Sequence, residues 1–411
     1  MRLAVAVSSR QVVGGIETWL RALVPELLRR NHAVVLVTEF AAAPGQPAIG
    51  DGAPGVPTLC RQELGADRVL AELARWEPDI VFAHGLAIPA FEAALLDRFP
   101  VALYAHTYVG TCAVGTKRHA FPRYQPCTRR MGPSCLVVNY LRRCGGLSPI
   151  ALHHSYARQR RLGSFLPRYA AIFVASRHMR EEFLRHGIAG DALHLAPLAP
   201  PGLEPDPEPP AERPPTGRIA FLGRLTRLKG VHLLLDAVER ASRELGRVRL
   251  DVMGNGPEQR RLEETARRRG LDVHFSGWVE GGARIEQLRA ADLLAVPSLW
   301  PEPFGLVGVE AGCVGVPAVA FAQGGIPDWL RPGISGELAP SPPTAAGLAG
   351  AIVRALADPS HHARLRRGAW ETSRTFTMAA HLAVLEPILA QAVQRAATRS
   401  SSAATRSPST S

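Results

Sequence analysis

The sequence of 411 residues lacks several features that would point to an integral-membrane, zinc-finger or nucleic-acid-binding protein. It has no run of 18 apolar residues, so we expect no membrane-spanning segment. None of its cysteines forms a C-x2-C pair, the spacing typical of zinc fingers. Aromatic residues make up only 6% and no nucleic-acid-binding module is recognisable, so we expect no nucleic-acid partner.

We also expect no secretory leader at the start of this sequence. The apolar part of the first seven residues is five residues long and leads into Ser8, Ser9 and Arg10, which fits a first β-strand better than an export signal. We therefore expect a cytoplasmic protein.

Acidic residues are absent from one long interval. Between Asp97 and Glu181 there is no Asp or Glu, although the chain as a whole carries 36 of them and a net charge of +12. The same interval contains Lys117, Arg118, Arg123, Arg129, Arg130, Arg142, Arg143, Arg158, Arg160, Arg161, Arg168, Arg177 and Arg180. Such a basic face would attract an anionic acceptor or the anionic lipids of a membrane surface, which makes peripheral binding at the inner membrane face one expectation. A generally Arg-rich composition accounts for part of the excess.

Strand-like and helical segments alternate along both halves of the chain. In the first half we expect strands at 3–7, 33–38, 80–83, 101–105, 172–175 and 192–196, with helices over 15–30 and through 75. In the second half we expect strands at 218–222, 249–253, 273–275, 293–296 and 318–321, with helices over 230–245, 257–269 and 304–314. This alternation predicts two α/β, Rossmann-like, doubly wound domains with parallel sheets, facing each other across a ligand cleft.

A proline-rich segment separates the two halves. Residues 197–216 contain too many prolines for a strand or helix and predict a linker. We therefore expect an N-terminal, acceptor-binding domain over 1–196, a C-terminal, nucleotide-sugar-binding domain over 217–374, a last helix within 375–396 and a disordered tail over 397–411.

Two carboxylates eight positions apart carry most of the chemical information. Glu302 lies in a loop after the expected strand 293–296, and Glu310 lies inside a helix expected to begin near Phe304. The first amides of a helix lack internal partners, so we expect an anionic group at Phe304, Gly305 and Leu306 and sugar hydroxyls on the carboxylates. A phosphate beside sugar hydroxyls describes a nucleotide sugar.

Further motifs accompany these carboxylates in a fixed order. They are 221–230 (FLGRLTRLKG), 253–258 (MGNGPE), 275–279 (FSGWV) and 324–328 (GGIPD), preceded by 14–17 (GGIE) and His106. Together with Glu302-x7-Glu310 they resemble the family 4 retaining glycosyltransferases over nearly the whole chain.

The resemblance implies a GT-B fold and a role for each matching residue. Arg224 and Lys229 would bind the donor diphosphate, His106 would be the active-site histidine, and Glu302 would act with them without being a nucleophile. The donor would also contact Gly14, Gly15, Gly254, Asn255, Val279, Phe304, Gly305, Leu306 and Glu310. The C-terminal helix would return to the first domain, and neither a metal nor another cofactor would be required.

Some positions depart from the family pattern or stay open. Thr107 stands where the family commonly has Asp after the histidine, and Asp328 replaces the usual Glu of its motif. Trp278 either stacks on the base or fills the core. The resemblance also places Ser298 near the sugar donor.

The cluster Cys112, Cys127, Cys135 and Cys144 has three open interpretations: a structural metal or redox site, simple packing, or a part of the acceptor site.

The resemblance predicts a transferase moving a sugar from a nucleoside diphosphate sugar to a saccharide or lipid-linked acceptor. A nucleotide-sugar 2-epimerase of the same fold and a non-catalytic sugar-nucleotide-binding subunit are the alternatives. The base, sugar, acceptor and linkage do not follow from the sequence.

Overall fold

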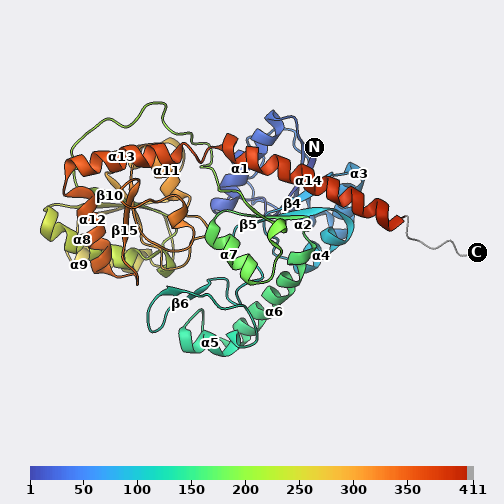
Figure 1. Cartoon of the computed structure of the whole chain (residues 1–411), viewed down its shortest axis with the longest axis horizontal. Coiled ribbons are helices and arrows are strands. Elements are labelled where there is room, and N and C mark those ends of the chain that lie inside the picture. Colours follow the sequence, from blue (N-terminus) through green and yellow to red (C-terminus); the bar gives the residue numbers. More distant parts are fainter. Residues whose placement is uncertain (405–411) are drawn as a thin grey trace, which may run out of the picture.

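Two α/β lobes lie side by side in the structure, a computed structural model that describes residues 1–404 (Figure 1). We call residues 1–196 the N-lobe and residues 217–374 the C-lobe. Each lobe is built around one parallel sheet with helices on its faces.

The N-lobe sheet has the order β3-β2-β1-β4-β5-β8-β9, and its neighbouring strands are parallel. Its strands are β1 (Arg2–Ser9), β2 (Ala33–Phe40), β3 (Thr58–Cys60), β4 (Ile80–Ala83), β5 (Val101–Ala105), β8 (Ala171–Val174) and β9 (Leu193–Leu195). Its helices are α1 (Gly15–Arg29), α2 (Arg61–Leu64), α3 (Ala66–Trp76), α4 (Pro89–Arg98), α5 (Cys135–Arg142), α6 (Pro149–Phe165) and α7 (Arg177–Arg185), with the short turns η1 (Leu166–Arg168) and η2 (Gly190–Ala192).

The C-lobe sheet has the order β12-β11-β10-β13-β14-β15 and is also parallel. Its strands are β10 (Arg218–Leu222), β11 (Arg249–Met253), β12 (Val273–Gly277), β13 (Leu293–Val296), β14 (Ala318–Phe321) and β15 (Gly336–Ala339). Its helices are α8 (Val231–Leu245), α9 (Gln259–Arg268), α10 (Gly281–Ala290), α11 (Val307–Cys313), α12 (Ala345–Leu356) and α13 (Pro359–Ser373), with η3 (Arg227–Lys229) and η4 (Ile326–Asp328).

Strands buried on both faces explain why the sequence predicts these sheets well. Every residue of β4, β5, β13 and β14 is buried, as expected for parallel strands covered by helices on both sides. The structure confirms the doubly wound architecture and adds the unpredicted strands β3 and β15. In each sheet the order reverses next to the first strand, between β1 and β4 and between β10 and β13, where such folds bind ligands.

The proline-rich segment forms no regular helix or strand, and part of it lies on the C-lobe. Asp206 accepts a bidentate ion pair from Arg289, and its carbonyl accepts a hydrogen bond from Trp370 Nε1 at 2.8 Å. Pro210 lies so close to Gly315 that a Cβ there would be 2.5 Å away. The segment is therefore a fixed strap along the C-lobe rather than a free spacer.

The last helix, α14 (Met378–Ala404), returns to the N-lobe. His381 Nδ1 contacts the carbonyl of Pro197 at 2.7 Å, and Glu386 pairs with Arg30 and His32. The helix runs beyond Ala396, where the sequence predicts a tail, and the rest of that tail, 405–411, lies outside the described residues.

The helical stretch Pro359–Thr398 is long and apolar enough to cross a membrane by length and composition, although it contains no uninterrupted run of 18 apolar residues. Leu382, Leu385 and Leu389 of this stretch have no exposed surface and belong to the core shared with α1 and β1. Its apolar face is therefore used in packing against the N-lobe.

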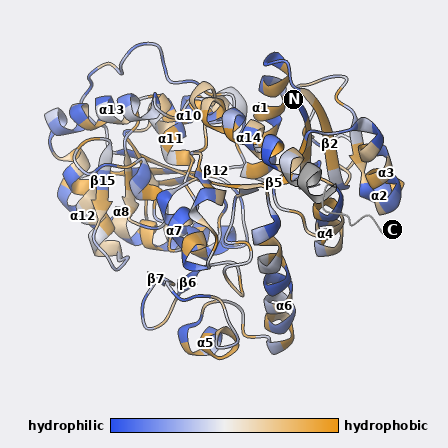
Figure 2. Ribbon diagram, turned by 45° about the vertical axis from the view of Figure 1, so that its right-hand side comes forward, coloured by the Kyte–Doolittle hydropathy of each residue, from blue (hydrophilic) through white to orange (hydrophobic). Residues whose placement is uncertain are grey.

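A segment between β5 and α6 stands apart from both sheets (Figure 2). We call residues 112–148 the insertion; it contains the two-stranded hairpin β6 (Arg118–His119) and β7 (Gln125–Pro126) and the helix α5. Lys117 anchors it, because its buried ammonium lies 2.5 Å from Glu182 of α7 and donates to the carbonyl of Arg129 at 2.5 Å.

A buried carboxyl on α4 makes the stability of the N-lobe depend on pH. Glu92 is 3% exposed and accepts a short hydrogen bond from the hydroxyl of Tyr169. Burial raises the pKa of Glu92 to about 7, so the folded protein binds this proton more strongly than the unfolded chain does. Protonated Glu92 therefore makes its full contribution to the free energy of unfolding below about pH 4.5, and this contribution is lost as the pH rises through about 7.

The wild type loses this contribution between pH 5 and pH 8, and Glu92→Gln does not. We therefore predict that the free energy of unfolding of Glu92→Gln, relative to that of the wild type, rises by about 2–3 kcal/mol between these two pH values. Urea unfolding at both pH values measures this, with the exposed Glu371→Gln as the control variant. A difference between Glu92→Gln and wild type that does not change with pH would contradict the assignment.

Candidate active site

The switch point of the C-lobe sheet brings a cation and a carboxylate together. Lys229 ends the loop after β10, and Glu302 lies in the loop after the neighbouring strand β13. Lys229 Nζ donates a hydrogen bond to Glu302 Oε1 at 2.6 Å, and the hydroxyl of Ser298 donates a short one to the same oxygen. Glu302 is 5% exposed, whereas the Lys229 side chain is 30% exposed. The pair is therefore open to solvent on the lysine side only.

Glycines allow these two loops to approach each other closely. Gly230 has φ +71°, and a Cβ on it would lie 1.9 Å from the carbonyl oxygen of Pro297. The amide of Leu299 also donates to the carbonyl of Leu228 at 2.8 Å. Any side chain at position 230 would push apart the loops that carry Lys229 and Glu302.

The turn after β11 completes the same edge of the sheet. A Cβ on Gly254 would lie 1.9 Å from the carbonyl oxygen of Gly223, and the carbonyl of Asn255 accepts a hydrogen bond from the amide of Leu225 at 2.8 Å. Arg224, in the facing loop, is exposed, and no described carboxylate pairs with its guanidinium. A cation without a partner beside a glycine turn leaves room for an anionic ligand.

The segment after β12 lies beside this turn. The amide of Gly254 donates to the carbonyl of Gly277 at 2.6 Å, and Val279 is half-buried against the core. Trp278 is 54% exposed, and its Nε1 donates to Glu280 at 2.7 Å. Of the two roles considered for Trp278, filling the core is therefore wrong.

The second glutamate stands further inside the lobe. Glu310 is 4% exposed, and its nearest cation is Arg284 of α10 at 3.5 Å. Burial raises the pKa of Glu310, and Arg284 opposes this shift. Its Oε2, the oxygen that faces Arg284, has no hydrogen-bond partner among the described residues, so it can still accept a hydrogen bond.

The helix that carries Glu310 begins later than the sequence predicts. α11 starts at Val307 rather than near Phe304, because Gly305 has φ +85° and interrupts the helical backbone. Phe304 is buried, its carbonyl accepts a hydrogen bond from Trp329 Nε1 at 2.7 Å, and Leu306 forms the cap. The amides of Phe304 and Gly305 therefore precede the helix and are not part of its first turn.

In the N-lobe, the loops after β4 and β5 bring two histidines together. His106 Nε2 lies 3.0 Å from His84 Nδ1, and both rings pack around Trp19 with His381 of α14. Burial, together with the nearby His381, lowers the pKa of His106 to about 3. His106 is therefore a neutral imidazole at ordinary pH. The sequence analysis missed His84, although its place directly after a buried strand is the same signal that singles out His106.

The glycines of the first turn stand at the start of α1. Gly14 is the N-cap residue in an extended conformation, and a Cβ on Gly15 would meet no atom within 4 Å. This end of α1 is open, which allows a ligand to approach the backbone. It lies on the same lobe as His106, and the structure gives no direct contact between the two.

The two lobes touch through these same loops. The hydroxyl of Tyr108 donates to the carbonyl of Pro301 at 2.8 Å, and Tyr108 packs edge-on against Trp300. Asp328 of η4 accepts two hydrogen bonds from Arg177 of α7, at 2.7 and 3.0 Å. The carboxyl edges of both sheets therefore face the same seam, and Asp328 has a defined partner across it.

Comparison with known proteins agrees with this architecture. Residues 13–199 match the family model described as Glycosyltransferase Family 4, and residues 205–372 match that described as Glycosyl transferases group 1. The chain belongs to the family 4 glycosyltransferases of the GT-B fold.

Several curated proteins of this family are related in sequence. A D-inositol 3-phosphate glycosyltransferase of Xylanimonas cellulosilytica is 33% identical over 250 residues, which cover 55% of this chain and 58% of that protein. A glycogen synthase of Mycobacterium tuberculosis is 33% identical over 186 residues, which cover 42% and 44% of the two chains. The chain thus matches only about half the length of these relatives.

Solved structures resemble the whole chain. Sucrose-phosphate synthase from Thermosynechococcus elongatus aligns with a TM-score of 0.67 and 22% identity over 98% of this chain and 100% of its own. HepE from Anabaena, solved in complex with UDP, aligns with a TM-score of 0.62 and 20% identity over 98% and 100%. These likenesses show the fold.

Lys229 and the buried Glu302 should be energetically coupled. We predict that Lys229→Met lowers the free energy of unfolding by about 1–3 kcal/mol, because it leaves a buried carboxylate without its cation. Adding Glu302→Gln should recover part of this loss. A double-mutant cycle by urea unfolding measures the coupling.

The matched control is the exposed pair Arg260–Glu264, changed to Met and Gln, for which about 0.2–1 kcal/mol is expected. Additive effects at Lys229 and Glu302, within about 0.5 kcal/mol, would mean that the hydrogen bond between them contributes nothing.

Proposed function

We propose that this protein is a retaining glycosyltransferase that moves a sugar from a nucleoside diphosphate sugar to a saccharide or lipid-linked acceptor, and that the transfer needs no metal ion. The observation that carries the proposal is the partly exposed Lys229 side chain, whose ammonium is paired with the buried carboxylate of Glu302 at the switch point of the sheet.

The residues around this pair suit a sugar donor that has a charged diphosphate at one end and a neutral sugar at the other. Lys229 and the unpaired Arg224 supply positive charge where the leaving diphosphate develops negative charge, which is the task a metal ion performs in other transferases. Glu302 and the unused acceptor of Glu310 suit sugar hydroxyls. HepE, which has a similar fold, was solved in complex with UDP, which supports a nucleotide as part of the ligand.

Lys229 would change partners when the donor binds. In the free protein its ammonium is satisfied by Glu302, and its exposed side is free to meet an entering phosphate. Ser298 also donates to Glu302, so this carboxylate keeps a donor when the lysine turns to the diphosphate. Glu302 would then be free to accept a sugar hydroxyl.

His106 would face the sugar from the N-lobe. Its low pKa keeps it neutral, so it would act as a hydrogen-bonding group rather than as a cation. His84 Nδ1 is hydrogen-bonded to His106 Nε2 and so fixes the orientation of the His106 ring. The family commonly has a carboxylate next to this histidine, at the position where this chain has Thr107. His84 is thus a positioning residue in this proposal.

We predict that Lys229→Ala lowers the rate of sugar transfer by about two to three decades, the effect of removing one group that stabilises a leaving anion. The anomeric configuration of the product, followed by NMR from the start of the reaction, should match that of the donor. Donors are first chosen by thermal shift against a panel of nucleoside diphosphate sugars.

Arg227→Ala, an exposed residue of the same short helix η3, is the control for general loss of charge. Activity is measured well below the melting temperature of each variant, so that unfolding does not enter. An inverted product, or Lys229→Ala with wild-type turnover, would overturn the proposal; conversion of the donor sugar to its epimer would favour the epimerase alternative.

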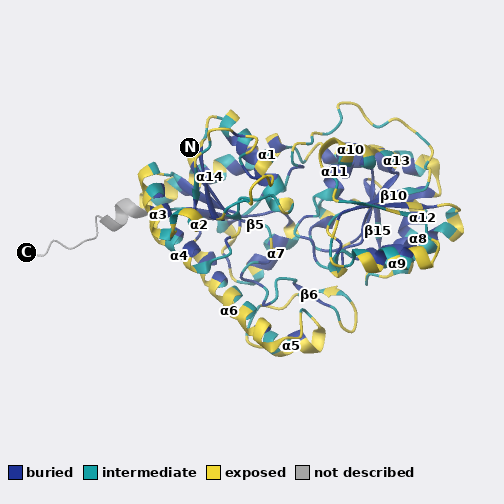
Figure 3. Cartoon of the chain, turned by 180° about the vertical axis from the view of Figure 1, so that it is seen from behind, coloured by how far each residue is buried: buried dark blue, intermediate teal, exposed yellow. Residues whose placement is uncertain are grey.

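We also propose that the insertion binds an anionic membrane surface and so brings the enzyme to a lipid-linked acceptor. Large apolar side chains there are unusually exposed: Val137 61%, Leu141 66%, Leu147 69% and Ile150, at the start of α6, 73% (Figure 3). Exposed arginines accompany them, namely Arg129, Arg130, Arg142 and Arg143. Apolar side chains beside arginines suit the boundary between lipid tails and anionic headgroups.

We predict that changing Arg129, Arg130, Arg142 and Arg143 together to Ser weakens binding to anionic liposomes at least about tenfold, with the remaining binding less sensitive to salt. Flotation or sedimentation at two salt concentrations measures it. The control removes the same charge from the C-lobe surface, at Arg240, Arg260, Arg267 and Arg268. Equal loss in both variants would mean that only net charge matters.

A further inference from the structure

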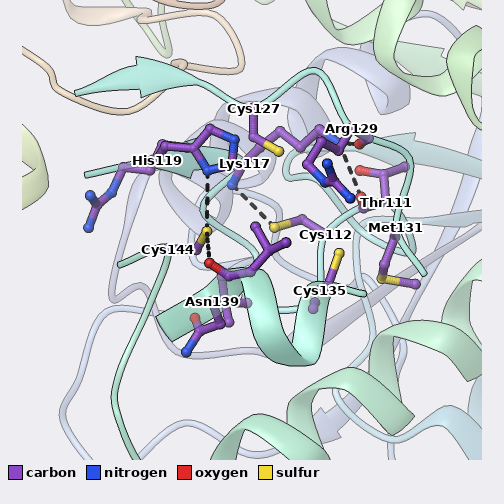
Figure 4. Close-up of a pocket in the computed structure, with 14 residues that line it drawn as sticks. Thr111, Cys112, Lys117, His119, Cys127, Arg129, Met131, Cys135, Asn139 and Cys144 are labelled. Atoms are coloured by element: carbon purple, nitrogen blue, oxygen red, sulfur yellow. Dashed lines mark hydrogen bonds between the residues drawn. The ribbon is translucent and has the colours of Figure 1, made fainter. Parts of the chain in front are cut away.

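Four cysteines far apart in the sequence meet in the insertion. Cys112, Cys127, Cys135 and Cys144 line one cavity of about 30 Å³, and Figure 4 shows their sulfur atoms turned towards it. A water molecule needs roughly 10–15 Å³, so the cavity admits an ion or a few waters but no sugar or nucleotide. The use of these cysteines in the acceptor site is therefore not supported.

The thiols are near enough to influence one another. Cys127, Cys112 and Cys135 all lie within electrostatic reach of the Cys144 thiol. His119 Nδ1 lies 3.4 Å from the sulfur of Cys144. The remaining cysteines, Cys60 and Cys313, lie in the two lobes and do not line this cavity.

Backbone amides point at two of the sulfurs. The amide of Lys117 donates to Cys112 Sγ at 3.3 Å, and the amide of Arg129 donates to Cys127. Backbone donors aimed at sulfur favour the thiolate, which is the form that binds a metal, more than the neutral thiol.

The insertion has no hydrophobic core of its own to keep it ordered. Between residues 112 and 148 only Ala113 belongs to the buried apolar residues, while the other buried side chains there are Lys117, His119 and Asn139. A folded segment of this size without a core usually depends on a metal ion or disulfides. The structure places all four cysteines as free thiols.

We propose that Cys112, Cys127, Cys135 and Cys144 form a structural zinc site that holds the insertion together. Four thiolates suit Zn²⁺, or another soft divalent ion, better than any hard cation. Each binds as the thiolate, so up to four protons are released on binding. The site ties the loop after β5, the hairpin and both ends of α5 into one unit.

Among the described residues, no three or more side chains are arranged as metal ligands. Metal binding therefore requires the cysteine side chains to rotate towards one another. Rotation of a cysteine about its Cα–Cβ bond moves its sulfur without moving the backbone. His119 stands beside Cys144 as a donor to its thiolate.

The site is separate from the proposed sugar transfer, which uses residues of the C-lobe switch point. Removing zinc should loosen the insertion and its membrane binding and leave the chemistry at Lys229 unchanged. Failure of one proposal therefore does not decide the other.

The test is the metal content and thiol chemistry of the full-length protein. Purified without chelator, it should carry about one zinc per chain by mass spectrometry, released by a mercurial reagent in step with thiol modification. Replacement by Co²⁺ should give the visible absorption of tetrahedral thiolate-bound cobalt.

Cys112→Ser and Cys144→Ser should each lose the zinc, and Cys60→Ser and Cys313→Ser should keep it. Chelation of the wild type should expose the insertion to limited proteolysis, a readout that requires no variant to fold. Less than about 0.2 zinc per chain after incubation with Zn²⁺, with four freely reactive thiols or with disulfides between them, would overturn the proposal.

Discussion

Parallel strand pairing is the constraint on which the rest of this structure depends. A parallel sheet needs a crossover after each strand, so every loop that leaves a carboxyl end emerges at the same edge. The two sheets turn these edges towards each other, as the contacts Tyr108–Pro301 and Arg177–Asp328 show. The candidate active site arises from this arrangement, because Lys229 and Glu302, 73 positions apart in the sequence, meet where the strand order reverses.

The same constraint explains what could be predicted from the sequence. Strands such as Ile80–Ala83, Val101–Ala105 and Leu293–Val296 are continuous apolar runs, and the structure confirms their bounds. Lys229 and Glu302 could be placed at a shared edge by counting strands alone, although the resemblance supplied their proposed roles.

Features decided by tertiary contact could not be predicted in this way. The hydrogen bond between His84 and His106 requires the fold, and the delayed start of α11 reflects the positive φ of Gly305, which the sequence permits but does not require. Trp278 is exposed although its residue type favours burial. The helix α6 lacks the apolar stripe by which a helix is recognised, and α5 is rich in apolar residues but leaves them exposed.

The insertion combines two unusual properties that belong together. Its surface exposes apolar side chains and arginines, and its interior holds thiols instead of a core. A segment that exposes its apolar residues has few left to form a core, so a metal bound by the four thiols would stabilise its fold in place of a core. It also reaches the other lobe, since Tyr124 of the hairpin packs against the C-lobe core.

The chain passes between the lobes twice, once at the start of the proline-rich strap and once before α14, and the two passages touch where His381 meets the carbonyl of Pro197. Because these two connections are neighbours, they restrict sliding and twisting of one lobe against the other more than rotation about the line that joins them. The lobes are thus held covalently at this point, whereas Arg177 and Asp328 hold the seam by non-covalent contacts alone.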